Sequence, residues 1–256
     1  MSQQQPLSEK LALITGCSGG IGQASARALA RLGCSIAVHH SSESSKPIAD
    51  KLVFEILSLS PGLRVHAFQA DLSTYDGAEK LHENVVKTLG HPDILFANHG
   101  TTGRKIGPTG DIQDISVEHF EEIWRTHAGT SFRLTQLCLP YMESQKWGRI
   151  IYTSSVAATT GGVIGPHYAS SKSALHGLAH WVSQRYSKDG ITSNIISPAL
   201  IADTVMMSDV NPELTKRIPV GRFGRSEEIA SVVALVATNA YMTNHIIPVD
   251  GGMTSG

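Results

Sequence analysis

Two residues about two thirds of the way along the 256-residue chain have the types and the spacing needed for proton transfer. Tyr168 and Lys172 stand four positions apart in the sequence Tyr-Ala-Ser-Ser-Lys, so on a helix they share one face. A lysine ammonium beside a phenol favours the phenolate and lowers the phenol pKa from its ordinary value of about 10. A phenol of this kind can give or take a proton near neutral pH. The Tyr-x-x-x-Lys spacing is common by chance, so the prediction depends on the residues around it.

A glycine-rich turn near the N-terminus has the form of a phosphate-binding loop. Gly16, Gly20 and Gly22 lie in the sequence Thr-Gly-Cys-Ser-Gly-Gly-Ile-Gly, between the apolar run 11–14 and the Ala- and Leu-rich segment 20–32. Glycines at a strand-to-helix turn let the backbone approach a pyrophosphate, and the helix N-terminus attracts the phosphate charge. Glycine turns after strands also serve plain packing, and for this turn alone both interpretations stay open.

The end of the second expected strand bears on which dinucleotide binds. An acid at this point bonds the adenosine ribose of NAD, and its absence leaves room for the 2′-phosphate of NADP. The residues here are His39, His40, Ser41 and Ser42, and the first acid is Glu43. Two hydroxyls and two imidazoles could hold a phosphate, although no Arg or Lys stands among them. The pattern favours NADP(H), with NAD(H) as the alternative cofactor and a solvated loop as the alternative structure.

Short apolar strands alternate with longer helical segments along the chain, an order typical of β-α-β units. Such units build a parallel sheet with helices on both faces and right-handed connections. We find no linker, low-complexity tract or repeat, so residues 1–256 are expected to form a single doubly wound α/β domain of about seven strands, with a short flexible N-terminus at 1–8. The expected strands are 11–14, 35–38, 64–69, 94–97, 149–153, 192–196 and 246–249, and the expected helices are 20–32, 48–59, 78–89, 117–145 (with Pro140 as a candidate break), 168–188 and 226–237.

Composition narrows the classes of function. Twenty-one basic and 22 acidic residues give a net charge of -1, which predicts no binding to nucleic acid or a membrane surface. No apolar run approaches the roughly 20 residues of a transmembrane helix, and the polar N-terminus lacks the pattern of a secretion signal. Three dispersed cysteines fit free thiols in a reducing compartment, so a cytoplasmic protein is expected. His176 and His180 have a zinc-type spacing but no clear third ligand, so no metal is expected.

Further ordered motifs accompany these features. They are Thr-Gly-x-x-x-Gly-Ile-Gly at 15–22, Asp71-Leu72, Asn98-His-Gly100, Ser155 thirteen residues before Tyr168, Ser197-Pro198 and Val249-Asp-Gly-Gly252. Together they resemble the classical short-chain dehydrogenase/reductase family over essentially the whole chain, with 3-oxoacyl-[acyl-carrier-protein] reductases or secondary-metabolite ketoreductases as the most similar groups. The resemblance implies a Rossmann fold and NADP(H)-dependent reduction of a ketone or 3-oxoacyl group, or the reverse oxidation of a secondary alcohol.

The resemblance also assigns roles to residues. Tyr168 would be the acid/base at the carbonyl oxygen, Lys172 would hold the nicotinamide ribose and lower the Tyr168 pKa, and Ser155 would bind the substrate oxygen. Asp71 would contact adenine, and Asn98 would support the central sheet. The cofactor-binding residues implied in this way are Gly16, Ser18, Gly20, Ile21, Gly22, His40, Ser41, Asp71, Leu72, Asn98, Gly100, Tyr168, Lys172, Pro198, Ile201 and Thr204.

The sequence departs from the family pattern at several positions. His127 stands where the family carries an Asn that completes a proton relay to the Lys. An imidazole can bond water and titrate near neutrality, so His127 either joins the relay as a catalytic residue or merely fills space. The usual Pro-Gly is Pro198-Ala199, and Asp203 stands where a Thr is expected, with Thr204 one place later. These changes leave the contact to the nicotinamide carboxamide open.

Loops at the carboxyl ends of the strands select the substrate in such folds. Here they are 101–116, 156–167 and 203–219, and His167 is expected at the pocket mouth. Val205, Met206 and Met207 predict an adaptable apolar lid in the substrate loop 203–219, and hence an apolar ketone or acyl substrate.

Partners and rival functions follow from the same resemblance. A small carbonyl or alcohol substrate is expected, with acyl-carrier linkage as an option. Arg104 and Lys105 could meet an acidic carrier or its phosphopantetheine, or could simply be solvated loop charges. The resemblance implies a homotetramer or homodimer. Two alternatives stay open: a catalytically silent NAD(P)-binding sensor, and a partner subunit of a hetero-oligomeric reductase.

Overall fold

Seven parallel strands form one sheet in the computed structural model, which describes residues 5–204 and 212–254. The strand order is β3-β2-β1-β4-β5-β6-β7. The chain therefore begins inside the sheet at β1, proceeds to one edge at β3, returns to β4 beside β1, and then proceeds to the other edge at β7. This is the single doubly wound domain expected from the sequence, and its winding reverses between β1 and β4, where such folds bind ligands. The strands are β1 (Leu11–Ile14), β2 (Ser35–His40), β3 (Val65–Gln69), β4 (Ile94–Ala97), β5 (Gly148–Thr153), β6 (Ile191–Pro198) and β7 (Ile246–Val249).

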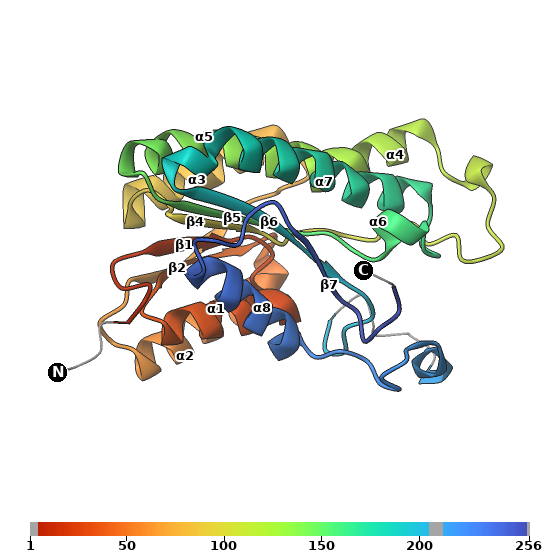
Figure 1. The fold of residues 1–256 in the computed structure, drawn as a ribbon, viewed down its shortest axis with the longest axis horizontal. Coiled ribbons are helices and arrows are strands. Elements are labelled where there is room, and N and C mark those ends of the chain that lie inside the picture. Colours follow the sequence, from red (N-terminus) through yellow and green to blue (C-terminus); the bar gives the residue numbers. More distant parts are fainter. Residues whose placement is uncertain (1–4, 205–211, 255–256) are drawn as a thin grey trace.

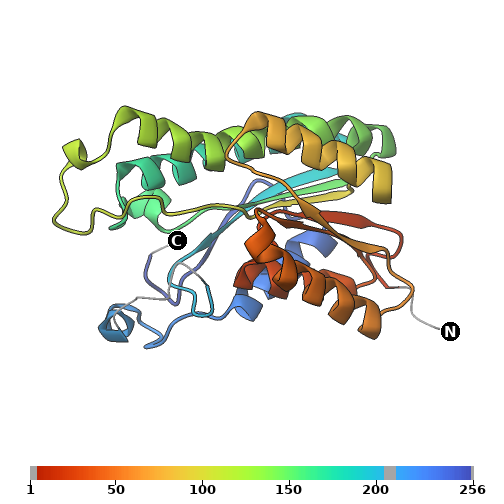
Figure 2. The same cartoon turned by 180° about the vertical axis from the view of Figure 1, so that it is seen from behind.

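Helices cover both faces of the sheet (Figure 1). One face carries α1, α2 and α8, and the other carries α3, α5 and α7, with α4 extending the line of α5; the view from behind shows the same layers (Figure 2). The helices are α1 (Gly20–Arg31), α2 (Lys46–Leu59), α3 (Tyr75–Leu89), α4 (Val117–Trp124), α5 (Thr130–Gln145), α6 (Ala157–Thr160), α7 (Pro166–Tyr186) and α8 (Ser226–Thr238).

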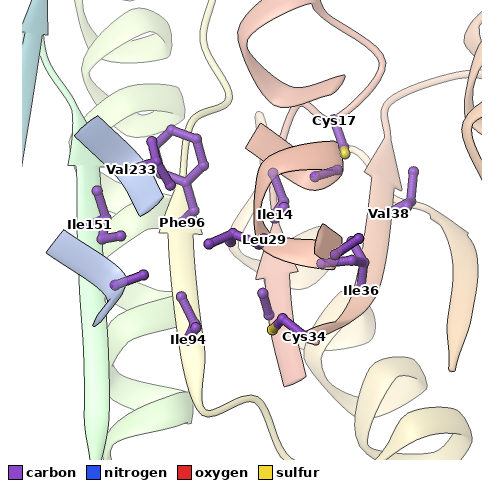
Figure 3. Close-up of a cluster of buried hydrophobic side chains, with 14 of the residues drawn as sticks. Ile14, Cys17, Leu29, Cys34, Ile36, Val38, Ile94, Phe96, Ile151 and Val233 are labelled. Carbon is purple, nitrogen blue, oxygen red and sulfur yellow. The ribbon is translucent and has the colours of Figure 1, made fainter. Parts of the chain in front are cut away.

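Alternate residues of each strand point into opposite helical layers, which produces two apolar clusters. Ile14 belongs to the cluster beneath α1 and α8, whereas its neighbour Leu13 belongs to the cluster beneath α3, α5 and α7. In the first cluster, Phe96 and Ile151 of adjacent strands lie beside Val233 of α8 (Figure 3). Each such side chain contributes about 1.5–3 kcal/mol on burial, so the strand ends and the loops that leave them are firmly placed.

The expected helix 117–145 is divided at a different place from Pro140. α4 ends at Trp124, a π-helical turn occupies Arg125–Gly129, and α5 then continues through Pro140. The prediction of a break at Pro140 was wrong because this residue lies on the exposed side of α5. Water can satisfy the carbonyl there that has lost its N–H partner.

The N-terminal segment is anchored earlier than the sequence suggested. Leu7 is buried at 1% exposure, and its N–H donates to the Leu32 carbonyl at 2.9 Å. The expectation of a flexible stretch through residue 8 was therefore wrong at Leu7, because this apolar side chain completes the first cluster. Residues 1–4 and the predicted lid residues Val205, Met206 and Met207 lie outside the described residues.

The three cysteines are free and buried. Cys17 and Cys34 belong to the first apolar cluster and Cys138 to the second. Burial raises the pKa of all three thiols above the ordinary value. Among the described helices, none is both long and apolar enough to cross a membrane.

Candidate active site

The predicted catalytic residues meet at the carboxyl edge of the sheet. Ser155 follows β5, and Tyr168 and Lys172 lie in the first two turns of α7. Gly165, with a φ of 148°, and Pro166 at the first helical position make α7 begin there. The structure thus brings together three residues that the sequence places up to seventeen positions apart.

Burial dominates the electrostatics of Tyr168 and Lys172. It raises the Tyr168 pKa above its ordinary value, although a hydrogen bond with Ser155 opposes this shift. Lys172 Nζ lies 6.0 Å from the centroid of the Tyr168 ring and donates to the Thr153 carbonyl at 2.8 Å. Burial lowers the Lys172 pKa to about 8. The expectation that Lys172 lowers the Tyr168 pKa was wrong for this structure, because the ammonium is directed to a carbonyl and not to the phenol.

Asn98 links the glycine turn to the strand that orients Lys172. Its Nδ2 donates to the carbonyls of Thr15 at 3.2 Å and Gly16 at 3.4 Å. Its Oδ1 accepts from the Thr153 hydroxyl at 3.0 Å, and the Thr153 carbonyl is the acceptor for Lys172. Both the nitrogen and the oxygen of the Asn98 amide are thus bonded to protein groups, so this residue has a supporting role beneath the site.

His127 lies in the π-helical turn with its ring edge-on to Tyr168, at a centroid distance of 5.5 Å. Its Nε2 accepts from the Thr101 N–H at 3.0 Å, so the neutral ring carries its proton on Nδ1 and donates to Ser171 Oγ at 2.8 Å. The Ser171 hydroxyl in turn donates to the Tyr168 carbonyl at 2.8 Å. Burial lowers the His127 pKa well below its ordinary value. Because both ring nitrogens bond to protein groups, this geometry favours a positioning role over a proton relay.

His99, which the sequence did not assign to the site, contacts the π-helical turn. Its Nε2 donates to the Thr126 carbonyl at 2.9 Å, and its Nδ1 accepts from the Thr15 hydroxyl at 2.8 Å. The extra residue of a π-turn frees a backbone carbonyl from the helical ladder, and here the freed group meets His99. Burial lowers the His99 pKa to about 3. An imidazole two residues after the buried strand β4 was the indication available in the sequence.

His39 braces the glycine turn from the end of β2. Its Nδ1 accepts from the Gly16 N–H at 2.9 Å, and its Nε2 donates to the Ala70 carbonyl at 3.0 Å. Burial lowers its pKa to about 4. β2 runs two residues further than expected, to His40, whose Nδ1 donates to the Ser42 carbonyl at 3.0 Å. The proposal that both imidazoles bind phosphate was therefore wrong for His39, whose ring nitrogens are both occupied, and Ser41 is the first exposed residue at the strand tip.

The glycine turn has the shape needed to hold a dinucleotide pyrophosphate. Gly16 has a φ of 61°, and a Cβ at Gly22 would lie 2.5 Å from the Gly16 carbonyl oxygen. α1 begins after Gly19 without a side-chain cap and without an acid in its first turn. Its first N–H groups are therefore suited to an anion, and the turn fits the phosphates of a bound dinucleotide.

The other predicted cofactor residues surround this turn. Asp71 follows β3, and its Oδ1 accepts from the Ser73 N–H at 2.9 Å, which lowers the Asp71 pKa. Leu72 is buried, and Ile21 packs against the first cluster, so these two contribute packing and backbone. A Cβ at Gly100 would lie 3.0 Å from His127 Nε2 and 3.3 Å from Lys172 Nζ, so a side chain there would crowd both groups. Ser18 lies within the turn, where its carbonyl accepts from Gln23 at 3.0 Å.

The segment after β6 reaches across the start of α1. Ile201 forms a bridge with Gly224, and the Thr204 hydroxyl donates to the Ile201 carbonyl at 2.9 Å. Asp203 has a φ of 61°, and its carbonyl lies 2.4 Å from where a Cβ at Gly20 would stand. Ala199 after Pro198 does not adopt a positive φ, so alanine replaces the usual glycine there without backbone strain.

The histidines with zinc-type spacing have other partners. His176 Nε2 lies 2.8 Å from Ser154 Oγ, and His180 Nδ1 lies 2.6 Å from Asn244 Oδ1. Within 5–204 and 212–254, no group of three or more His, Cys, Asp or Glu side chains is arranged to hold a metal ion.

Comparison with known proteins agrees with this geometry. The family model described as short chain dehydrogenase matches residues 10–215. The chain is 33% identical over 254 residues to the 3-oxoacyl-[acyl-carrier-protein] reductase FabG of Pseudomonas aeruginosa, covering 96% of this chain and 98% of that protein. It is 32% identical over 252 residues to the L-rhamnose 1-dehydrogenase (NADP(+)) of Thermoplasma acidophilum, covering 95% and 96%. A crystal structure of a blue fluorescent protein from a metagenomic library in complex with NADPH superposes with a TM-score of 0.87 at 31% identity, covering 98% of this chain and 100% of that chain.

The chain belongs to the short-chain dehydrogenase family. It is an NAD(P)-dependent oxidoreductase built on the single Rossmann domain described above. The relatives act on different substrates by name, so family membership alone leaves the substrate to the site itself.

Proposed function

We propose that the protein is an NADP(H)-dependent carbonyl reductase that acts on a ketone or a 3-oxoacyl group, with Tyr168 as its acid/base. The observation that supports this most directly is the hydrogen-bonded pair of Ser155 and Tyr168 hydroxyls, with Lys172 one helical turn away. These groups stand beside the glycine turn at the carboxyl edge of the sheet, which is where an open α/β fold presents its ligand.

Ser155, Tyr168 and Lys172 have different roles in the proposed reduction. Bound nicotinamide supplies the hydride. A carbonyl oxygen placed between the Ser155 and Tyr168 hydroxyls accepts two hydrogen bonds, which strengthen as negative charge grows on that oxygen. Tyr168 then gives its proton to the oxygen, and in the direction of oxidation it takes the proton back. The Lys172 ammonium, held on the Thr153 carbonyl, is placed to hold the nicotinamide ribose beside Tyr168.

The preference for NADP(H) is proposed from the tip of β2. Ser41 is exposed there and no carboxylate stands at the strand end, so a 2′-phosphate meets no like charge. The NADPH-bound structural relative and the NADP(+)-dependent rhamnose dehydrogenase support the same choice. NAD(H) is the alternative cofactor, and His40 and Ser41 are the residues proposed to tell the two apart.

Substrate and assembly belong to the same proposal. Similarity to 3-oxoacyl-[acyl-carrier-protein] reductases supports a β-keto substrate, including one carried on an acyl carrier. Cytoplasmic location and assembly as a homotetramer or homodimer are proposed with it, and sedimentation of the purified protein tests the assembly.

The test is turnover by the purified chain with NADPH, and separately with NADH, across a panel of ketones and β-keto esters, followed at 340 nm. Tyr168→Phe is the matched variant, and it should lose about 10²- to 10⁴-fold in kcat while NADPH binding is kept. Full activity in Tyr168→Phe would show that the acid/base assignment is wrong. Tight NADPH binding without turnover on any member of the panel would point to a sensor or to a subunit that needs a partner.

A further inference from the structure

Residues 101–104, directly beyond the Gly100 that adjoins Lys172, are held by imidazole rings from three separate elements. Every one of these contacts goes to a backbone group of the segment, and every one uses Nε2 of the ring. The contacts are Thr101 N–H to His127 at 3.0 Å, His167 to the Thr102 carbonyl at 3.1 Å, and Arg104 N–H to His119 at 3.0 Å.

The three rings tie this segment to the proposed acid/base. His127 lies edge-on to Tyr168, and His167 immediately precedes Tyr168 on α7. His119 of α4 lies beside His167, with ring centroids 5.2 Å apart. His127 thus contacts Tyr168, His167 is its neighbour in the chain, and His119 is linked to it through His167. Together the three rings set the position of residues 101–104 relative to Tyr168.

Glycine makes the close approach of His119 feasible. Gly103 has a φ of 56°, and a Cβ there would lie 2.5 Å from His119 Nε2. The segment then continues toward α7, where the Ile106 N–H donates to the Ile164 carbonyl at 3.0 Å. Residues 101–106 thus run from beside Lys172 to the loop just before α7, the helix that carries Tyr168.

Neighbouring groups fix which ring nitrogen accepts. His119 Nδ1 lies 3.2 Å from Glu122 Oε2, so Nδ1 carries the proton and Nε2 is left to accept from Arg104. Backbone groups of surface loops can ordinarily form their hydrogen bonds with water, so this segment does not need three imidazoles to satisfy them. Their common effect is to fix the path of the backbone.

We propose that His119, His127 and His167 are positioning residues that hold residues 101–104 as a fixed wall of the substrate site, and that this wall governs how well the carbonyl substrate binds. The inference rests on the proposed reductase function, because it assigns the wall to the same site. It differs from that proposal in assigning substrate affinity to groups that touch neither the reacting carbonyl nor the cofactor.

His119 is the member to test, because it lies farthest from the reacting groups. His119→Leu replaces the ring by an apolar side chain and removes the acceptor for the Arg104 N–H. His119→Gln places an amide oxygen near the former Nε2 position and keeps that hydrogen bond. The leucine variant should raise KM for the best carbonyl substrate about fivefold to tenfold, the effect of one lost hydrogen bond, while kcat and NADPH affinity change far less. The glutamine variant should restore KM to within about twofold of the wild type.

Amide hydrogen exchange measures the wall without turnover. The amides of residues 101–104 should exchange faster in His119→Leu than in the wild type, and His119→Gln should reverse this. An unchanged KM in the leucine variant, an equal rise in both variants, or unchanged exchange overturns the inference. A wild-type protein that turns over no carbonyl refutes the proposed function instead, and the exchange measurement then still decides whether the histidines hold the segment.

Discussion

Acid should destabilise this fold through three buried histidines that must stay neutral. His39, His99 and His127 each use one ring nitrogen as a donor and the other as an acceptor, which only an uncharged imidazole can do. Protonation would set an N–H of the ring against a donor of the protein. Burial lowers the pKa of His39 to about 4 and of His99 to about 3, and that of His127 well below its ordinary value.

The sign and size follow from proton binding by the unfolded chain. An unfolded histidine titrates near 6.5, whereas these folded rings stay neutral to well below that, so between those limits only the unfolded state takes up protons. The stabilisation is complete above about pH 6.5 and is lost as the pH falls toward the folded pKa values. At about pH 5.5 each ring should have lowered the free energy of unfolding by about 1.4 kcal/mol, and the three together by about 4 kcal/mol. This is a large part of a typical folding free energy.

Urea unfolding followed by tryptophan fluorescence, at fixed protein concentration and ionic strength, measures this directly. The free energy of unfolding should fall by about 4 kcal/mol between about pH 7.5 and 5.5. His39→Asn keeps an acceptor for the Gly16 N–H but cannot titrate, so its curve should be flatter by about 1.4 kcal/mol. His66→Asn, at an exposed position on β3, is the matched control and should keep the wild-type slope. Equal stability at both pH values, or a His39→Asn slope equal to that of the wild type, would refute the reasoning.

Other perturbations test the site piece by piece. Ser41→Asp should shift the ratio of NADPH to NADH affinity toward NADH by at least about tenfold, because a carboxylate would face the 2′-phosphate; fluorescence titration measures it. Because the Lys172 pKa is lowered to about 8, kcat/KM for reduction should fall as the pH rises through that value. Gly20→Ala should cost about 1–3 kcal/mol and weaken NADPH binding, because the new Cβ would meet the Asp203 carbonyl at 2.4 Å; thermal unfolding and titration check both. His127→Gln should keep the contact to the loop amide and lose the contact to the hydroxyl of α7, so its kcat should fall more than its KM rises in steady-state kinetics.

Local sequence patterns were sufficient to predict much of the fold. The strand β1, apolar at every position, could be read as buried on both faces, and the glycine turn after it could be placed from spacing alone. The seven strands follow from the same alternation of apolar runs and helical segments. These features depend on residues close together in the sequence, so the sequence states them directly.

The parts that escaped prediction depend on contacts between distant residues. In the π-helical turn the Thr126 carbonyl accepts from the Thr130 hydroxyl and also from His99 Nε2, and the contact with His99 spans 27 positions that no local pattern predicts. The Tyr168 pKa shift had the wrong expected sign because spacing reveals the nearby lysine but hides the burial of both groups. The histidine contacts to residues 101–104 likewise appear only once α4 and α7 lie side by side.

The three buried thiols can report on local and global unfolding of the protein. Only the thiolate reacts quickly with alkylating or disulfide reagents, and burial keeps Cys17, Cys34 and Cys138 both protonated and out of reach. Chemical labelling of a native sample should therefore wait for local or global unfolding, and its rate would time those events. Cys17 sits in the glycine turn and Cys138 beneath the opposite face of the sheet. Labelling of the two thiols would thus distinguish a breathing motion at the dinucleotide end from loss of the whole structure.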